Sequence, residues 1–133
     1  MLLRKPKVLH ALPGRLRVNV PYLARWGQED HQGLLPVLGR LLALPEGIDA
    51  VRPCAVTGNV LIRYDVDRLG EKDVLAYVQT LYKLSVAHRV ALSQALARDR
   101  DGLERRMTDW LRQALARQLP LDPDMKIPHH VFE

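Results

Sequence analysis

The side chains best suited to bind a metal are two adjacent histidines near the C-terminus and a single cysteine. His129 and His130 follow one another, and Cys54 is the one cysteine among 133 residues. Imidazole and thiolate groups bind iron, zinc and copper, and they can also bind haem iron. Adjacent side chains of an extended chain point in opposite directions, so the two histidines would ligate across a dimer or together with Glu133. The alternatives are a polar tail for the histidines and a small buried apolar residue for Cys54.

Basic side chains form a second candidate site, which could bind an anionic partner. The chain carries 20 Lys and Arg against 15 Asp and Glu, and no acid precedes Glu29. Alternation along a strand places Arg15 and Arg17 on one face, and Arg63 can join them from a paired strand. Such side chains bind phosphates and carboxylates, although a solvated charged face is the alternative. The candidate anion- or partner-binding residues are Lys5, Lys7, Arg15, Arg17 and Arg63.

The third candidate is the apolar stripe of a helix predicted over residues 99–119. Asp101 begins a segment with capping-box spacing, which places the start of this helix. The stripe is wide enough to pack against the preceding helix or against a second copy of the chain. We therefore expect Met107, Trp110 and Leu111 to make a core, partner or dimer contact.

The motifs indicate neither a catalytic site nor an RNA-binding site. The sequence has no Ser/His/Asp signature, no phosphate-binding loop and no Gly-rich dinucleotide motif, so we expect no enzyme. RNA-binding sheets stack bases on strand aromatics, and here the strands offer Tyr64 alone, on their apolar face. Nucleic acid is therefore not an expected partner, although charge-driven binding stays an alternative. No run of about 18 apolar residues exists, so we expect a cytoplasmic protein, with the inner face of the membrane as an alternative location.

The N-terminal part of the chain reads as a strand, a loop and a helix. An extended stretch begins at Val8, and Pro13 and Gly14 predict a kink or bulge where its alternating part starts. Residues 21–31 are polar and predict a loop. Leucines at helical spacing then predict a helix over residues 32–44.

A hairpin and helices follow. Strands are predicted over residues 48–56 and 60–65, around a tight turn in which Gly58 takes a positive φ. The pattern then predicts one long helix over residues 70–98, because no Pro or Gly interrupts it. With the helix over 99–119, this long helix could form a helical hairpin.

Together these elements predict an α+β fold with a ferredoxin-like βαββα unit and a C-terminal helical hairpin extension. The expected organisation is a basic arm at 1–7, this unit with its long second helix at 8–98, an amphipathic helix at 99–119 and an extended tail at 120–133. The unit lacks its fourth strand. The tail could supply that strand, within the same chain or by exchange with a second subunit. Otherwise it docks as an extended peptide or is a free arm.

Three segments in this order resemble the heavy-metal-associated domains. They are His10–Val18, Leu44–Val51 and Val56–Asp65, and the similarity covers about residues 7–80. It is greatest to the cysteine-less subgroup found with bacterial metal-transporting P-type ATPases. The resemblance implies a ferredoxin-like fold and a role in metal handling, with iron as the metal of this subgroup. It carries over no metal site, because the loop over residues 21–31 lacks the Cys-x-x-Cys of the metal-binding members.

We therefore expect a non-catalytic accessory or adaptor protein of bacterial metal homeostasis. Its expected partner is a protein, either a metal-transporting ATPase or a metal-storage assembly, and homo-oligomers and peripheral membrane contact are alternatives. No cofactor is expected. The first alternative is a direct carrier of a transition metal or haem that uses the tail histidines, and the second is a charge-driven nucleic-acid binder.

Overall fold

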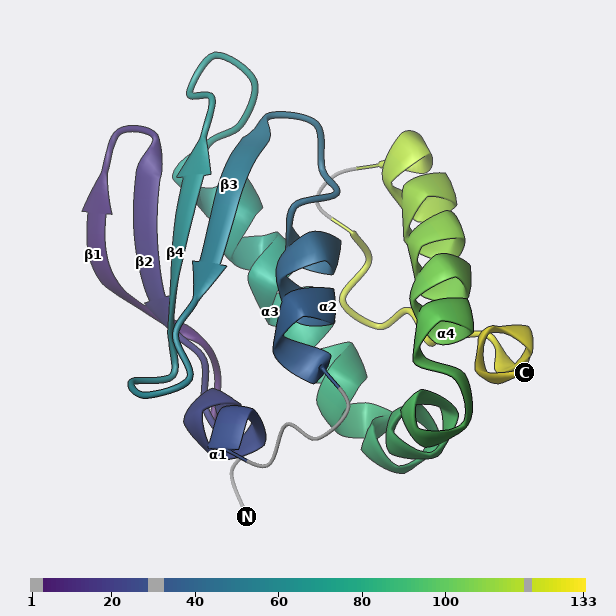
Figure 1. The fold of residues 1–133 in the computed structure, drawn as a ribbon. Helices are drawn as coiled ribbons and strands as arrows, with labels where there is room; N and C mark the ends of the chain where they lie inside the picture. Colours follow the sequence, from purple (N-terminus) through teal and green to yellow (C-terminus); the bar gives the residue numbers. More distant parts are fainter. Residues whose placement is uncertain (1–3, 29–32, 119–120) are drawn as a thin grey trace.

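An antiparallel β-sheet forms one layer of the molecule, and helices cover one of its two faces (Figure 1). The computed structural model describes residues 4–28, 33–118 and 121–133. The strands are β1 (Lys7–Leu12), β2 (Arg15–Asn19), β3 (Ile48–Pro53) and β4 (Asn59–Tyr64). The helices are α1 (Leu23–Gln28), α2 (Leu34–Leu42), α3 (Glu71–Ala87) and α4 (Arg89–Arg117), and a 3₁₀ turn, η1, spans His129–Phe132. The fold is therefore α+β, as the sequence predicted.

The strand order is β1-β2-β4-β3, and each neighbouring pair is antiparallel. Alternation decides which side chains reach the core, because Leu16 and Val18 of β2 and Ile62 of β4 are fully buried. The hydroxyl of Tyr77 on α3 donates to the Leu41 carbonyl at 2.6 Å, which ties α3 to α2. Burial raises the pKa of the Tyr77 phenol, so it stays a neutral donor.

The N-terminal segment folds as a hairpin, whereas the sequence predicted one strand with a kink. β1 and β2 pair across a turn at Pro13 and Gly14, and Gly14 has a φ of +76°. Proline presets the φ of its position and glycine accepts a positive φ, so this dipeptide makes a turn and not a bulge. The turn also contacts β4, because the Tyr64 amide donates to the Gly14 carbonyl at 3.0 Å. The fourth strand is therefore β1, at the edge of the sheet.

The C-terminal tail supplies no strand within the described residues. It packs against the helices and ends in η1. At the other end of the chain, the basic arm expected over residues 1–7 is shorter than predicted, because Lys7 belongs to β1. The guanidinium of Arg98 donates to the Phe132 carbonyl at 2.7 Å, and that of Arg106 donates to the Val131 carbonyl at 2.7 Å. The buried apolar side chains of the tail are Leu121, Ile127, Val131 and Phe132.

The long helix predicted over residues 70–98 is interrupted at His88, where α3 and α4 meet. The Nε2 atom of His88 accepts from the Ile127 amide of the tail at 3.4 Å. Its ring centroid lies 5.7 Å from that of Phe132. The break therefore coincides with contacts from a segment about 40 residues further along the chain.

A second bend divides α4 at Asp99, where φ is −159° and ψ is 87°. The Asp99 carboxylate accepts from the Gly102 amide at 3.0 Å, which is the hydrogen bond of a helix N-cap. The prediction that Asp101 caps this helix was therefore wrong by two residues.

A short turn of helix, α1, also occupies part of the loop predicted over 21–31, and its first residue, Leu23, is buried.

Candidate functional site

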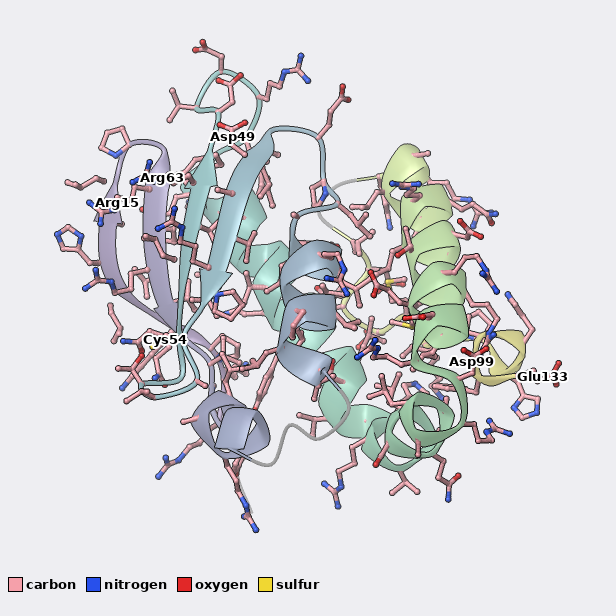
Figure 2. The ribbon with its side chains drawn as sticks, viewed as in Figure 1. Arg15, Asp49, Cys54, Arg63, Asp99 and Glu133 are labelled. Atoms are coloured by element: carbon pink, nitrogen blue, oxygen red, sulfur yellow. The ribbon has the colours of Figure 1, made fainter. Side chains whose placement is uncertain are left out.

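Arginines gather on the open face of the sheet, which the helices leave uncovered. The same alternation that buries Leu16 and Ile62 turns Arg15 of β2 and Arg63 of β4 outward. These two arginines are direct cross-strand partners in the register of β2 and β4. Figure 2 shows both at the end of the sheet near the β1–β2 turn, away from the helices. Like charges directly opposite one another on a sheet destabilise it, so this arrangement has a cost to the fold.

Two further arginines extend this surface. Leu61 of β4 lies between Arg17 of β2 and Arg52 of β3 in the register of the sheet. Neighbouring strands lie about 4.8 Å apart, so Arg17 and Arg52 are separated by the width of two strand spacings. We call this surface the basic face. Its residues are Arg15, Arg17, Arg52 and Arg63.

The basic face has an uncompensated positive charge. Within the described residues, none of its four guanidinium groups makes a hydrogen bond or an ion pair. The four strands contain five Lys and Arg residues and one acid, Asp49. Asp49 precedes Ala50, which is the cross-strand partner of Arg63. Figure 2 shows Asp49 at the same end of the sheet as Arg15 and Arg63. An anionic surface would therefore find four available guanidinium groups here.

Arg15, Arg17 and Arg63 share one face, as the sequence predicted, whereas Arg52 was not predicted to join them. The alternation of β3, in which Val51 faces inward, was the signal that could have found it. Lys7 lies on the same face as Arg15 and Arg17, because its cross-strand partner Asn19 follows Arg17 by two residues, whereas Lys5 precedes β1. Lys7 pairs with Asn19 at the opposite end of β2, about 13 Å along the strand from Arg15.

The predicted metal ligands do not come together. His129 and His130 are exposed on η1, and the Nε2 atom of His129 lies 3.6 Å from a carboxylate oxygen of Glu133. Figure 2 shows Cys54 beside the sheet and Glu133 on the far side of the helices. Among residues 4–28, 33–118 and 121–133, no three His, Cys, Asp or Glu side chains are close enough to share an ion. A pair of exposed ligands does not fit the closed tetrahedral sets of stable metal sites, nor an enclosed haem pocket.

Cys54 is exposed, whereas the sequence predicted a buried position in a strand. It follows β3 in the turn to β4, where the Gly58 amide donates to the Cys54 carbonyl at 2.9 Å and Gly58 has a φ of +76°. Hydrogen bonds lower the pKa of the Cys54 thiol. The largest effect comes from the Thr57 hydroxyl, and the backbone amides of Thr57 and Val56 contribute less. β3 ends at Pro53, and the Cys54 amide beyond it still donates to the Asn59 carbonyl at 2.8 Å, so the thiol lies in the turn and outside the sheet.

The expected partner contact on the last helix is used inside the chain instead. Met107 is 6% exposed and Leu111 is fully buried, so both side chains belong to the chain's own core. Trp110 is half-buried against the same core. The stripe packs on the chain's own helices and tail, which is the core alternative that the sequence left open.

Within the described residues, no helix has both the length and the apolar character needed to cross a membrane. Comparison of the chain with protein-family models, with curated proteins and with solved structures finds no match.

Proposed function

We propose that this chain is a non-catalytic adaptor that docks through its basic face to an acidic surface of a partner protein. The observation that carries the proposal is the opposed pair Arg15 and Arg63, which has no acidic partner in the described residues. Two guanidinium groups held opposite one another cost the isolated fold stability. Carboxylates of a partner would remove that repulsion and form charge-assisted hydrogen bonds with both groups. The cost in the free protein is then recovered in the complex.

The strand arrangement supports the ferredoxin-like part of the proposal. Apart from the short helix α1, which precedes α2, the elements from β2 to α3 follow the βαββα order, and β4 lies between β2 and β3. β1 lies beside β2, where a ferredoxin-like sheet would place its final strand. On this basis we retain the resemblance to the cysteine-less heavy-metal-associated domains. We further propose metal homeostasis as the setting, with a metal transporter or a metal-storage assembly as the partner.

Observations on the same face favour a protein partner over nucleic acid. Tyr64, the one Phe, Tyr or Trp among the strand residues, is 7% exposed and points into the core. The exposed imidazole of His10, the cross-strand partner of Arg17, is then the one ring that the strands offer for base stacking on this face, whereas RNA-binding sheets stack two or three bases. An exposed leucine borders the arginines, because Leu12 is 48% exposed and is the cross-strand partner of Arg15. A mixed apolar and basic surface is typical of protein interfaces that are rich in arginine.

The decisive variant is Arg15→Glu, because it should change stability and docking in opposite directions. It replaces a like-charge cross-strand pair by an opposite-charge pair, which should stabilise the fold by about 0.2–1 kcal/mol. The same change should weaken docking about tenfold or more, because it puts a negative charge against an acidic partner. Arg112→Glu is the matched control, since Arg112 is exposed on α4 and undergoes the same charge change.

Docking can be measured in cells with a photo-crosslinking amino acid at Leu61, the centre of the basic face. We expect adducts with an acidic protein, which Arg15→Glu reduces and Arg112→Glu retains. A crosslinker at Gln113 on the exposed side of α4 should give none of these adducts. Equal labelling at both positions, adducts with RNA alone, or an Arg15→Glu variant that labels as well as wild type would refute docking through this face.

The metal setting is tested separately by deleting the gene and measuring growth under iron, zinc and copper limitation and excess. Wild type and Arg112→Glu should restore metal tolerance, whereas Arg15→Glu should not. A deletion strain without a metal phenotype would remove metal homeostasis from the proposal and leave the docking result standing.

A further inference from the structure

An apolar groove lies between α2 and α4, in a different layer of the molecule from the basic face. Its volume is about 490 Å³, which falls within the range of small-molecule sites. We call it the α2–α4 groove. Its apolar lining comes from Leu34, Val37, Leu38 and Leu41 of α2 and from Val90, Leu92, Leu96, Leu103 and Met107 of α4.

The bend at Asp99 makes this groove possible. Leu92 and Leu96 precede the bend, and Leu103 and Met107 follow it, yet all four line the same space. An unbroken helix of this length would present them along one straight line. Leu96, Leu103 and Met107 are between 2% and 7% exposed and form the floor.

The walls are less covered than the floor. Leu34, Leu38 and Leu92 are half-buried, and Val90 is 63% exposed. Apolar side chains that are left partly in water gain about 25 cal/mol for each Å² that a ligand covers. The groove therefore favours an apolar occupant.

The charges along the groove indicate what the occupant carries at its polar end. Glu104 is neutralised, because the guanidinium of Arg40 donates to both of its carboxylate oxygens at 2.6 Å. Arg89 also lines the groove, is exposed, and makes no ion pair or hydrogen bond within the described residues. Ser85, Ser93 and Gln94 supply the other polar groups of the lining. One uncompensated positive charge therefore stands beside an apolar groove.

We propose that the α2–α4 groove binds a single alkyl chain that ends in a carboxylate, such as a medium-chain fatty acid. The chain lies on the leucines, and the carboxylate meets the Arg89 guanidinium. Two turns of a partner helix would fill roughly 850 Å³, from a diameter of about 10 Å and a rise of about 5.4 Å per turn, which exceeds the groove. An alkyl chain fits within it and leaves its carboxylate at the exposed Arg89.

The test uses the full chain with dodecanoate and with dodecanol, which has the same chain without the charge. Isothermal titration calorimetry below the micelle concentration should give one dodecanoate per chain with a micromolar dissociation constant. Arg89→Glu should weaken dodecanoate at least tenfold and change dodecanol less than twofold. Leu38→Glu should abolish binding of both, because it puts a charge among the leucines. Arg105→Glu, an exposed change elsewhere on α4, should bind dodecanoate as wild type does.

A second measurement covers the case in which Leu38→Glu fails to fold. A dodecanoate analogue with a diazirine on its chain is photo-crosslinked to wild-type protein, and the labelled peptides are mapped. Labels on α2 and α4 support the proposal, and labels elsewhere overturn it. The proposal is also overturned by no saturable binding, by equal dodecanoate affinity in the Arg89→Glu variant, or by a concentration-dependent dimer that buries the groove. Arg15→Glu should leave dodecanoate binding unchanged, so this result is independent of docking through the basic face.

Discussion

Replacing Val131 by alanine tests whether the C-terminal tail is part of the cooperative fold. Val131 is fully buried, and its carbonyl accepts a hydrogen bond from the Arg106 guanidinium at 2.7 Å. The neighbouring carbonyl of Phe132 accepts from Arg98 in the same way. The substitution leaves both carbonyls in place, so it measures the burial of the side chain alone. Its matched control is Val56→Ala, because Val56 is 84% exposed in the turn between β3 and β4.

The expected cost follows from the two methyl groups that alanine lacks. Each buried methyl contributes about 0.8 kcal/mol, and the remaining cavity adds to the loss, so Val131→Ala should cost ~2 kcal/mol. Val56→Ala should cost less than about 0.5 kcal/mol, because its side chain is already in water. The loss in free energy of unfolding from the same Val→Ala change is therefore expected to be about fourfold or more larger at Val131 than at Val56.

Equilibrium unfolding in urea at pH 7 measures both variants. With an m-value of about 2 kcal/mol/M, the midpoint of Val131→Ala should fall by ~1 M while its slope stays that of wild type. A tail that opens on its own, before the rest of the chain, would transmit little of the loss to the global transition. A Val131→Ala midpoint within about 0.2 M of the Val56→Ala midpoint would therefore refute the reasoning that the tail is a structural element.

Two predictions concern groups whose pKa the fold lowers. The Arg40 hydrogen bonds lower the pKa of Glu104 from its ordinary value of 4.5, so the ionised pair stabilises the fold above that value and its contribution is lost as pH falls through the lowered pKa. Glu104→Gln should therefore be less stable than wild type at pH 7. The loss should be less than about 1 kcal/mol, because Arg40 is largely exposed. Urea unfolding should show a smaller difference between the two proteins at pH 3 than at pH 7. A difference that is the same at both pH values would contradict this assignment. For Cys54, Thr57→Val should move the pH profile of iodoacetamide alkylation to higher pH, because the Thr57 hydroxyl lowers the thiol pKa, whereas Thr57→Ser should keep the wild-type profile. Identical profiles for Thr57→Val and wild type would show that the hydroxyl does not stabilise the thiolate.

The parts of the fold that the sequence predicted are those whose burial follows a regular period. β2 and β4 alternate cleanly because the helices cover one face and leave the other open, so Arg15 and Arg63 could be assigned to a common face. β1 could not be recognised in this way. It lies at the sheet edge with Leu9 and Leu12 half-exposed, so its apolar residues do not alternate with polar ones.

The basic face was predictable in part, because two levels of information define it. Period-two alternation gives the direction of each arginine, whereas the register of β2 against β4 decides that Arg15 stands opposite Arg63. The register of β1 against β2 depends in turn on Pro13 and Gly14, which the sequence pattern misassigned as a bulge. The separation of Lys7 from Arg15 has the same origin, because the hairpin runs the chain back along itself.

The tail and the α2–α4 groove are connected through the start of α4, which explains why no local pattern of the sequence specifies how the tail packs or where the groove lies. His88 accepts the Ile127 amide and contacts Phe132, and the next residue, Arg89, lines the groove. A sequence window around His88 contains apolar residues at helical spacing and no breaker, so it predicts an uninterrupted helix. The break coincides with the contacts of the tail, and tertiary contacts can override weak local propensity. The position of Arg89 at the groove therefore depends on contacts of His88 with Ile127 and Phe132 of the tail, which is a property of the packed chain and not of any local pattern.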